Sequence, residues 1–254
     1  MIRDPKAHWT QVARSIRKRK GSSFLAGESD PYHAYKRKKM LKHFLERVSF
    51  AERTVLEVGC GPGGNLRLIA ERFSPRRLIG VDISEEMLEI ARERLVGYHN
   101  VELQETDSGH LNLPDRVADV SFTVTVLQHI ADDDVFKRLV AEICRVTREE
   151  IVLIEDMPIA PAAGGADRHS PDRYRREVTQ HGFRIEGMES LRLKLSRWGY
   201  WHIRRLLTRE FHERGDPQRV AAIALMHAWI GVSRWGDWCF DDEGDLTKLV
   251  FRRA

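Results

Sequence analysis

The chain has 254 residues, 42% hydrophobic and 31% charged, which suits one α/β domain with additions and excludes wholesale disorder. Its three cysteines lie far apart without a C-x-x-C pair, which argues against a disulfide framework or a zinc site and fits a reducing cytoplasm. We expect a cytoplasmic protein with no transmembrane segment, because the N-terminus lacks a secretion signal and the longest weakly polar run, 220–232, is too short to span a bilayer.

The first 53 residues predict a helical cap. Residues 7–20 and 32–48 have helical patterns, joined by the linker Gly21–Ser29. Asp30 and Pro31 are typical of a helix start, since Asp caps free N–H groups and Pro fits the first turn. Residues 1–54 also carry fourteen Lys and Arg against five Asp and Glu, within a chain of net charge +4. This basic segment either attracts an anionic substrate or nucleic acid, or is simply a solvated face.

From residue 54 onward, short apolar strands alternate with helices. This alternation predicts an α/β fold with a doubly wound, mostly parallel sheet of Rossmann-like type, covered by helices on both faces. The expected strands are Thr54–Val58, Leu78–Val81, Val101–Gln104, Asp119–Val126 and Ile151–Ile154, and the expected helices are Leu66–Phe73, Glu85–Leu95, Asp134–Val146 and Pro171–His181.

The C-terminal part differs in composition. A long strand with a tail is expected at Phe183–Leu193 and a last strand at Leu246–Arg252. Residues 196–240 between them look helical, with a break at Gly215-Asp216-Pro217, and they hold most of the tryptophans. This insertion forms a lid over a binding pocket, a helical pair with its own core, or a surface that docks on a membrane.

A glycine turn follows the first strand and opens a helix. Gly59, Gly61, Gly63 and Gly64 let the backbone bend sharply and approach a ligand, at the carboxyl end of a parallel strand where such folds bind ligands. The turn alone is ambiguous, because its spacing also fits a dinucleotide site. Asp82, after the second strand, suits a ribose contact in either case.

The residues near this turn favour S-adenosylmethionine over a dinucleotide. Glu57 precedes the turn, where a carboxylate suits a sulfonium ligand with an ammonium group but repels a pyrophosphate. Asp107 and Ser108 follow the third strand and can meet an adenine edge. The segment Ala118–Ile130 then closes the fourth strand.

Five segments in this order carry a resemblance to a known family: VLEVGCGPGGN (55–65), GVDIS (80–84), Glu105-Thr106-Asp107-Ser108, ADVSF (118–122) and VLQHI (126–130). The chain resembles the class I S-adenosylmethionine-dependent methyltransferases, in the small-molecule style called methyltransferase type 11. The resemblance covers roughly residues 50–190 and the terminal strand.

The resemblance implies a seven-stranded sheet that ends in an antiparallel hairpin, formed here by Phe183–Leu193 and Leu246–Arg252. The cofactor-binding core then comprises residues 54–193 and 246–254, with residues 194–245 as a Trp-rich helical insertion. The insertion departs from the family, and such loops often carry function. The resemblance implies cofactor contacts from several turns. Around the methionine part these are Gly59, Cys60, Gly61 and Gly63, with Asn65 of the same motif. Asp82 is expected on the ribose, Ile83, Asp107 and Ser108 on the adenine, and Thr125 facing the cofactor.

The catalytic candidates lie at strand ends near the expected methyl group. Methyl transfer is an in-line displacement, so a base is needed only if the acceptor loses a proton. His129 is one candidate base, and Glu155 is another, with Asp156 beside it. From the basic segment, Arg37 is expected to meet the carboxylate of the methionine part.

We therefore expect a monomeric or homodimeric enzyme that transfers a methyl group to a small molecule, such as a natural product, a sugar or a lipid-linked metabolite, without a metal. The alternative is an RNA or other nucleic-acid methyltransferase that uses the basic N-terminal segment. A nicotinamide-dependent oxidoreductase and a binding module without turnover also stay open.

Overall fold

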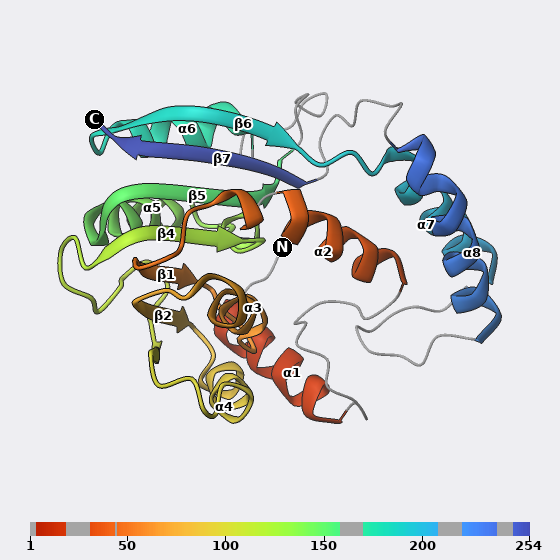
Figure 1. The fold of residues 1–254 in the computed structure, drawn as a ribbon, viewed down its shortest axis with the longest axis horizontal. Helices are drawn as coiled ribbons and strands as arrows, with labels where there is room; N and C mark the ends of the chain where they lie inside the picture. The colour runs from red at the N-terminus through yellow and green to blue at the C-terminus, as the bar shows by residue number, and fades with distance from the viewer. Residues whose placement is uncertain (1–3, 19–30, 44, 158–169, 208–219, 238–245) are drawn as a thin grey trace.

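The computed structural model describes residues 4–18, 31–43, 45–157, 170–207, 220–237 and 246–254. Its centre is one seven-stranded sheet in the order β3-β2-β1-β4-β5-β7-β6 (Figure 1). The first five strands of this order are parallel, and β7 is antiparallel to both β5 and β6. The predicted doubly wound sheet with an antiparallel terminal hairpin is therefore confirmed. The strands are β1 (Thr54–Val58), β2 (Arg77–Asp82), β3 (Val101–Glu105), β4 (Ala118–Val124), β5 (Thr147–Asp156), β6 (Phe183–Ser190) and β7 (Leu246–Arg253).

Helices cover both faces of the sheet because successive strand residues point to opposite sides. In β1, Leu56 and Val58 face one core, while Val55 faces the other. The Leu56 face packs against α5 (Asp133–Val146) and α6 (Pro171–Thr179). The Val55 face packs against α3 (Gly64–Phe73) and α4 (Glu85–Arg94). Each face is thereby buried under apolar helix surfaces, as a parallel sheet requires.

Two N-terminal helices lie on different parts of this core. The apolar face of α1 (Pro5–Lys18) packs along α4, with Val12 and Ile16 against Met87. In contrast, α2 (Pro31–His43) lies with α7 (Lys194–Leu207) and α8 (Val220–Gly236) beyond the carboxyl ends of the parallel strands (Figure 1). An apolar cluster around Tyr32, Tyr200 and Met226 joins these three helices. Within the part of the chain that the structure describes, no helix is long and apolar enough to cross a membrane.

Some boundaries differ from the predictions. The helix expected at 32–48 ends at His43, and a separate 3₁₀ turn follows at Leu45–Arg47. Strand β5 begins at Thr147, four residues before the predicted start, because α5 runs directly into it. The linker Gly21–Ser29 and the break at 215–217 lie outside the described residues.

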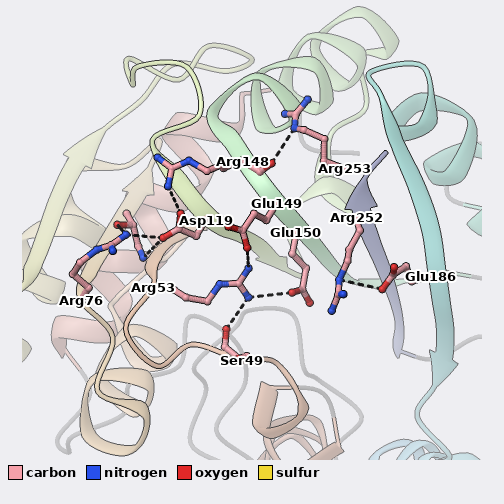
Figure 2. Close-up of polar contacts among 11 residues, drawn as sticks. Ser49, Arg53, Arg76, Asp119, Arg148, Glu149, Glu150, Glu186, Arg252 and Arg253 are labelled. Atoms are coloured by element: carbon pink, nitrogen blue, oxygen red, sulfur yellow. Dashed lines mark hydrogen bonds and ion pairs between the residues drawn. The ribbon is translucent and has the colours of Figure 1, made fainter.

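The early start of β5 depends on ion pairs at the amino edge of the sheet (Figure 2). Arg53 donates to Glu149 (2.5 Å) and to Glu150 (3.2 Å), so two charged residues are accommodated in a strand. These charges made the segment look unlike a strand in the sequence, since periodicity alone does not reveal a partner 96 residues away.

Asp119 is another charged residue at this edge, and it is only 5% exposed. Its Oδ2 accepts from the backbone N–H of Thr54 and from Arg76, both at 2.8 Å, and its Oδ1 accepts from Arg148 (Figure 2). Asp119 thus ties β1 to β4 and to the loop before β2, and its place at the start of the fourth strand is structural.

We expect Asp119→Ala to lower the free energy of unfolding by about 3 kcal/mol, because it leaves the Thr54 N–H buried without an acceptor. Asp119→Asn keeps one acceptor oxygen and should lose about 1 kcal/mol. Urea denaturation followed by circular dichroism measures both. An alanine variant as stable as the parent protein would contradict this role.

Candidate functional site

A cavity of about 460 Å³ opens at the carboxyl ends of β1 and β4. The glycine turn after β1 forms one side, and the turn after β4 forms another. Helices α2 and α7 close it from outside the sheet, with Trp9 of α1 at its edge. The cavity therefore lies where doubly wound folds bind ligands.

The glycine turn needs its glycines for both conformation and space. Gly59 has φ +75° and Gly61 has φ +51°, a left-handed region that other residues adopt only with strain. A Cβ on Gly59 would also lie 2.4 Å from Val126 Cγ2. The N–H groups of Gly59 and Cys60 donate to Val81 O at 2.8 and 3.0 Å, which fixes the turn against β2. Gly63 instead lies against Ala91 and is not among the residues that line the cavity.

A buried carboxyl group, Glu57, faces the cavity beside this turn. Its residue is 1% exposed, and burial raises its pKa to about 8. Asn65, at the start of α3, donates from Nδ2 to Glu57 Oε1 at 2.7 Å. Among the described residues, neither Glu57 Oε2 nor Asn65 Oδ1 has a hydrogen-bond partner. Two buried acceptor atoms at a cavity wall are the arrangement that a ligand with several N–H donors, such as an ammonium group, would satisfy.

Arg37 of α2 lines the same cavity as this pair and is near enough to interact with the charge of Glu57. Burial lowers the pKa of its guanidinium, while the charge of Glu57 opposes that shift. Arg37 lines the cavity, as do Glu57, Cys60 and Asn65. Apart from Gly63, the residues predicted for the methionine part therefore line one cavity, where Arg37 offers a cation to an anionic ligand group.

The turn after β4 is held by Glu155. This side chain is fully buried, and its Oε1 accepts from Thr123 Oγ1 (2.7 Å) and from the Val126 N–H (3.2 Å). Its Oε2 accepts from the Gln128 N–H (3.2 Å). Burial raises the pKa of Glu155 to about 7. Glu155 does not line the cavity, so it acts on the turn and not directly on a ligand.

The cavity side of this turn presents Thr125, Gln128 and His129. Thr125 has φ +55°, a strained conformation for a residue with a Cβ, which places it just past the end of β4. Its backbone N–H donates to Ile154 O at 2.8 Å. The His129 ring packs edge-on against Trp9, with centroids 5.3 Å apart. Asp156 also lines the cavity and accepts from Lys36 Nζ at 2.9 Å.

The residues predicted for the ribose and the adenine lie outside the cavity. Asp82 is 7% exposed, and its two oxygens accept from the N–H groups of Gly61 (2.8 Å) and Ser84 (3.0 Å). Burial raises its pKa to about 6. Ile83 is half-buried, and Asp107 and Ser108 are exposed after β3. Their cofactor roles stay predictions.

The cavity is also lined by residues from two further helices. Trp9 of α1 was not expected from the sequence, whereas the insertion offered as a lid over a binding pocket contains Arg197, Tyr200, Trp201 and Arg204 of α7. The α7 residues are spaced i, i+3, i+4 and i+7, which places them on one helix face. That spacing was visible in the sequence, but nothing local shows what the face covers. Among the described residues, no group of three His, Cys, Asp or Glu side chains is placed to hold a metal ion.

Comparisons with known proteins agree with this geometry. Residues 55–150 match the family described as "Methyltransferase domain". The predicted resemblance to the class I S-adenosylmethionine-dependent methyltransferases is confirmed over this segment. A trans-aconitate 2-methyltransferase of Rhizobium etli is 40% identical over 88 residues, which are 34% of this chain and 33% of that protein. The chain spans less than half the length of the curated relatives it matches.

Solved structures share the fold at low identity. An S-adenosylmethionine-dependent methyltransferase from Mesorhizobium loti has a TM-score of 0.58 at 17% identity, covering 85% of this chain and 98% of that chain. The cyclase SpnF has a TM-score of 0.59 at 19% identity, covering 89% of this chain and 86% of that chain. The same fold therefore carries more than one reaction.

We expect Gly59→Ala to lower the free energy of unfolding by about 3 kcal/mol, since it combines left-handed strain with a collision against Val126. Gly97→Ala is the matched control, because Gly97 has φ +95° but nothing within 4 Å of an added Cβ. It should cost only about 1 kcal/mol. Urea denaturation measures the free energy of unfolding of both variants. Equal losses for Gly59→Ala and Gly97→Ala would show that the space around Gly59 does not limit stability.

Proposed function

We propose that this chain transfers a methyl group from S-adenosylmethionine to a small-molecule acceptor. The observation that carries the proposal is the pair of buried acceptors, Glu57 Oε2 and Asn65 Oδ1, beside a glycine turn in a cavity. The match of residues 55–150 to a methyltransferase domain supports it.

The residues present fit the methionine end of this cofactor. Glu57 and Asn65 would accept from the ammonium group, and Arg37 would pair with the carboxylate. Asp82, Ile83, Asp107 and Ser108 are proposed for the ribose and the adenine, along the edge that α1 borders. At that edge Thr10 Oγ1 lies 3.3 Å from Ser84 Oγ, and Lys6 pairs with Glu105 at 2.7 Å.

Catalysis would come chiefly from positioning. When bound, S-adenosylmethionine supplies an electrophilic methyl group on a cationic sulfur. Holding an acceptor in line with such a group can contribute on the order of 7–11 kcal/mol. His129 is the proposed base for acceptors that must lose a proton, because it lines the cavity on the turn that Glu155 organises. Glu155 is proposed to position this turn, not to take the proton.

A small-molecule acceptor is favoured over nucleic acid because basic residues of the N-terminal segment form ion pairs within the fold. Arg14 pairs with Glu86 at 3.3 Å, and Arg17 pairs with Glu89 at 3.1 Å. These two cations of α1 therefore form ion pairs with α4. Arg53 pairs with Glu149 at the opposite edge of the sheet. Charges that are used within the fold are less available to phosphates of a duplex or strand.

The proposal is tested by binding and by product. The purified protein should bind S-adenosylhomocysteine in calorimetry, and S-adenosylmethionine should be converted to it in the presence of an acceptor. If the protein binds S-adenosylhomocysteine but does not form it from S-adenosylmethionine, the remaining explanations are a binding module without turnover and a reaction of another kind, as in the cyclase. Failure to bind the nucleoside would overturn the proposal.

We expect Glu57→Gln to weaken S-adenosylhomocysteine binding about tenfold or more, because it removes a charged acceptor for the ammonium group. In the parent protein the affinity should rise as the pH increases from 6.5 to 8.5. The reason is that the raised pKa of Glu57, about 8, keeps the carboxyl neutral at the lower end of this range. The variant should lack this rise.

The control is Glu71→Gln on the exposed side of α3, where Glu71 pairs with Arg67 at 2.7 Å. It should bind the nucleoside as the parent protein does, with the same pH dependence. A Glu57→Gln variant with unchanged affinity across the range would remove Glu57 from the binding site.

A further inference from the structure

Helix α2 presents two different faces to its surroundings. One face lines the cavity through residues spaced i, i+3, i+4 and i+7, namely His33, Lys36, Arg37 and Met40. A second face holds Tyr35 and Lys39, which are spaced i and i+4 and do not line the cavity. Because a helix turns as one body, the contacts of the second face also set the direction in which Arg37 extends.

A buried carboxylate meets this second face. Asp237 follows α8 directly and is fully buried. Its Oδ2 accepts from Tyr35 Oη at 3.3 Å, and Lys39 Nζ lies 3.7 Å from the same oxygen. Burial raises the pKa of the Tyr35 phenol, and the charge of Asp237 adds to this shift. Tyr35 therefore remains a hydrogen-bond donor at neutral pH.

The same carboxylate is fixed on α7 and α8. Its Oδ1 accepts from the Ser196 N–H at 2.9 Å, and its Oδ2 accepts from Ser196 Oγ at 2.6 Å. The Asp237 N–H donates to Ser233 O of α8 at 2.8 Å, so the backbone of this residue is held as well. Asp237 is thus a fixed point of the α7–α8 pair, and α2 is bonded to it.

This polar contact adds direction to apolar packing. The Tyr32 ring of α2 stacks on Tyr200 of α7 with centroids 4.6 Å apart, which keeps the two helices together. The hydrophobic effect is non-directional, whereas a hydrogen bond weakens steeply when its angle departs from linear. A buried polar contact can therefore favour one arrangement of packed helices over its neighbours.

Resting on the proposed function, we propose that Asp237 is a positioning residue for the cofactor, which holds α2 so that Arg37 meets the carboxylate of S-adenosylmethionine. Asp237 does not line the cavity, so it acts through α2 and does not touch the ligand. The affinity for the methionine end then depends on α7 and α8, which lie outside the matched segment 55–150. In the proposed function the adenosine part does not contact Arg37, so its binding is independent of Asp237.

The test compares two nucleosides that differ only in the group that Arg37 would bind. S-adenosylhomocysteine has both the ammonium and the carboxylate, whereas its decarboxylated analogue keeps the ammonium alone. Calorimetry measures both affinities for the full chain. Asp237→Asn should weaken S-adenosylhomocysteine binding about fivefold or more and leave the affinity for the decarboxylated analogue within about twofold. A general loss of structure would weaken both alike.

A double variant shows whether Asp237 acts through Arg37. Arg37→Gln alone should weaken S-adenosylhomocysteine binding about tenfold. In that background Asp237→Asn should cause no further loss, because both substitutions act on one contact. Losses that add in full would overturn the inference, since Asp237 would then affect binding by another route.

Two further variants complete the test. Tyr35→Phe keeps the ring and removes only the hydroxyl that reaches Asp237, so it should give the same pattern with a loss of about threefold. It decides the test if circular dichroism shows that Asp237→Asn does not fold. Asp119→Asn is the matched control, because it removes the charge of a buried carboxylate at the amino edge of the sheet. It should leave both affinities unchanged.

The inference is overturned if Asp237→Asn and Tyr35→Phe bind S-adenosylhomocysteine as the parent protein does, or if they weaken both nucleosides equally. Either result, with S-adenosylhomocysteine still bound by the parent protein, leaves the proposed function intact. An Arg37→Gln variant with the parent affinity also overturns the inference, because Arg37 would then not meet the carboxylate. Failure of the parent protein to bind S-adenosylhomocysteine overturns the proposed function itself.

Discussion

A carboxyl group buried on a sheet face is the constraint on which the site depends. Glu57 occupies a position on β1 that shares a face with Val55, where an apolar side chain would pack against α3 without cost. Burial of an ionisable group is unfavourable unless partners compensate for it. Asn65 provides one hydrogen bond, and Arg37 provides an opposite charge from another part of the chain. The compensation within the protein is incomplete, and a ligand ammonium group would complete it.

The helices beyond the sheet are joined through a second buried carboxylate. Asp237, at the end of α8, is fully buried and accepts from Ser196 Oγ at 2.6 Å and from Tyr35 Oη at 3.3 Å. Lys39 of α2 lies 3.7 Å from the same carboxylate. These contacts make α2 part of the layer built by α7 and α8. Arg37 and the cavity-lining residues of α7 are therefore carried by one connected layer.

The sequence was most informative where the structural reason is local. The glycine turn needs positive φ at Gly59, and this requirement is visible in the residue type itself. The face of α7 at Arg197, Tyr200 and Arg204 was equally regular, but helical spacing shows which residues share a face and not what the face covers. Glu155 shows the opposite difficulty, because a carboxylate at a strand end looks the same whether it meets a ligand or, as here, backbone N–H groups.

Separate elements carry the two halves of the proposed chemistry. The glycine turn, Glu57 and Asn65 belong to the segment that matches a methyltransferase domain, whereas α7 lies beyond residue 150, where that match ends. Substitutions on α7 can change the side of the cavity that this helix lines without altering the backbone geometry at Gly59. Since one fold carries different reactions, the residues that select the acceptor should lie where the chain departs from the shared domain. The face of α7 that lines the cavity is therefore a better guide to the acceptor of this chain than the substrates of proteins that share only its core.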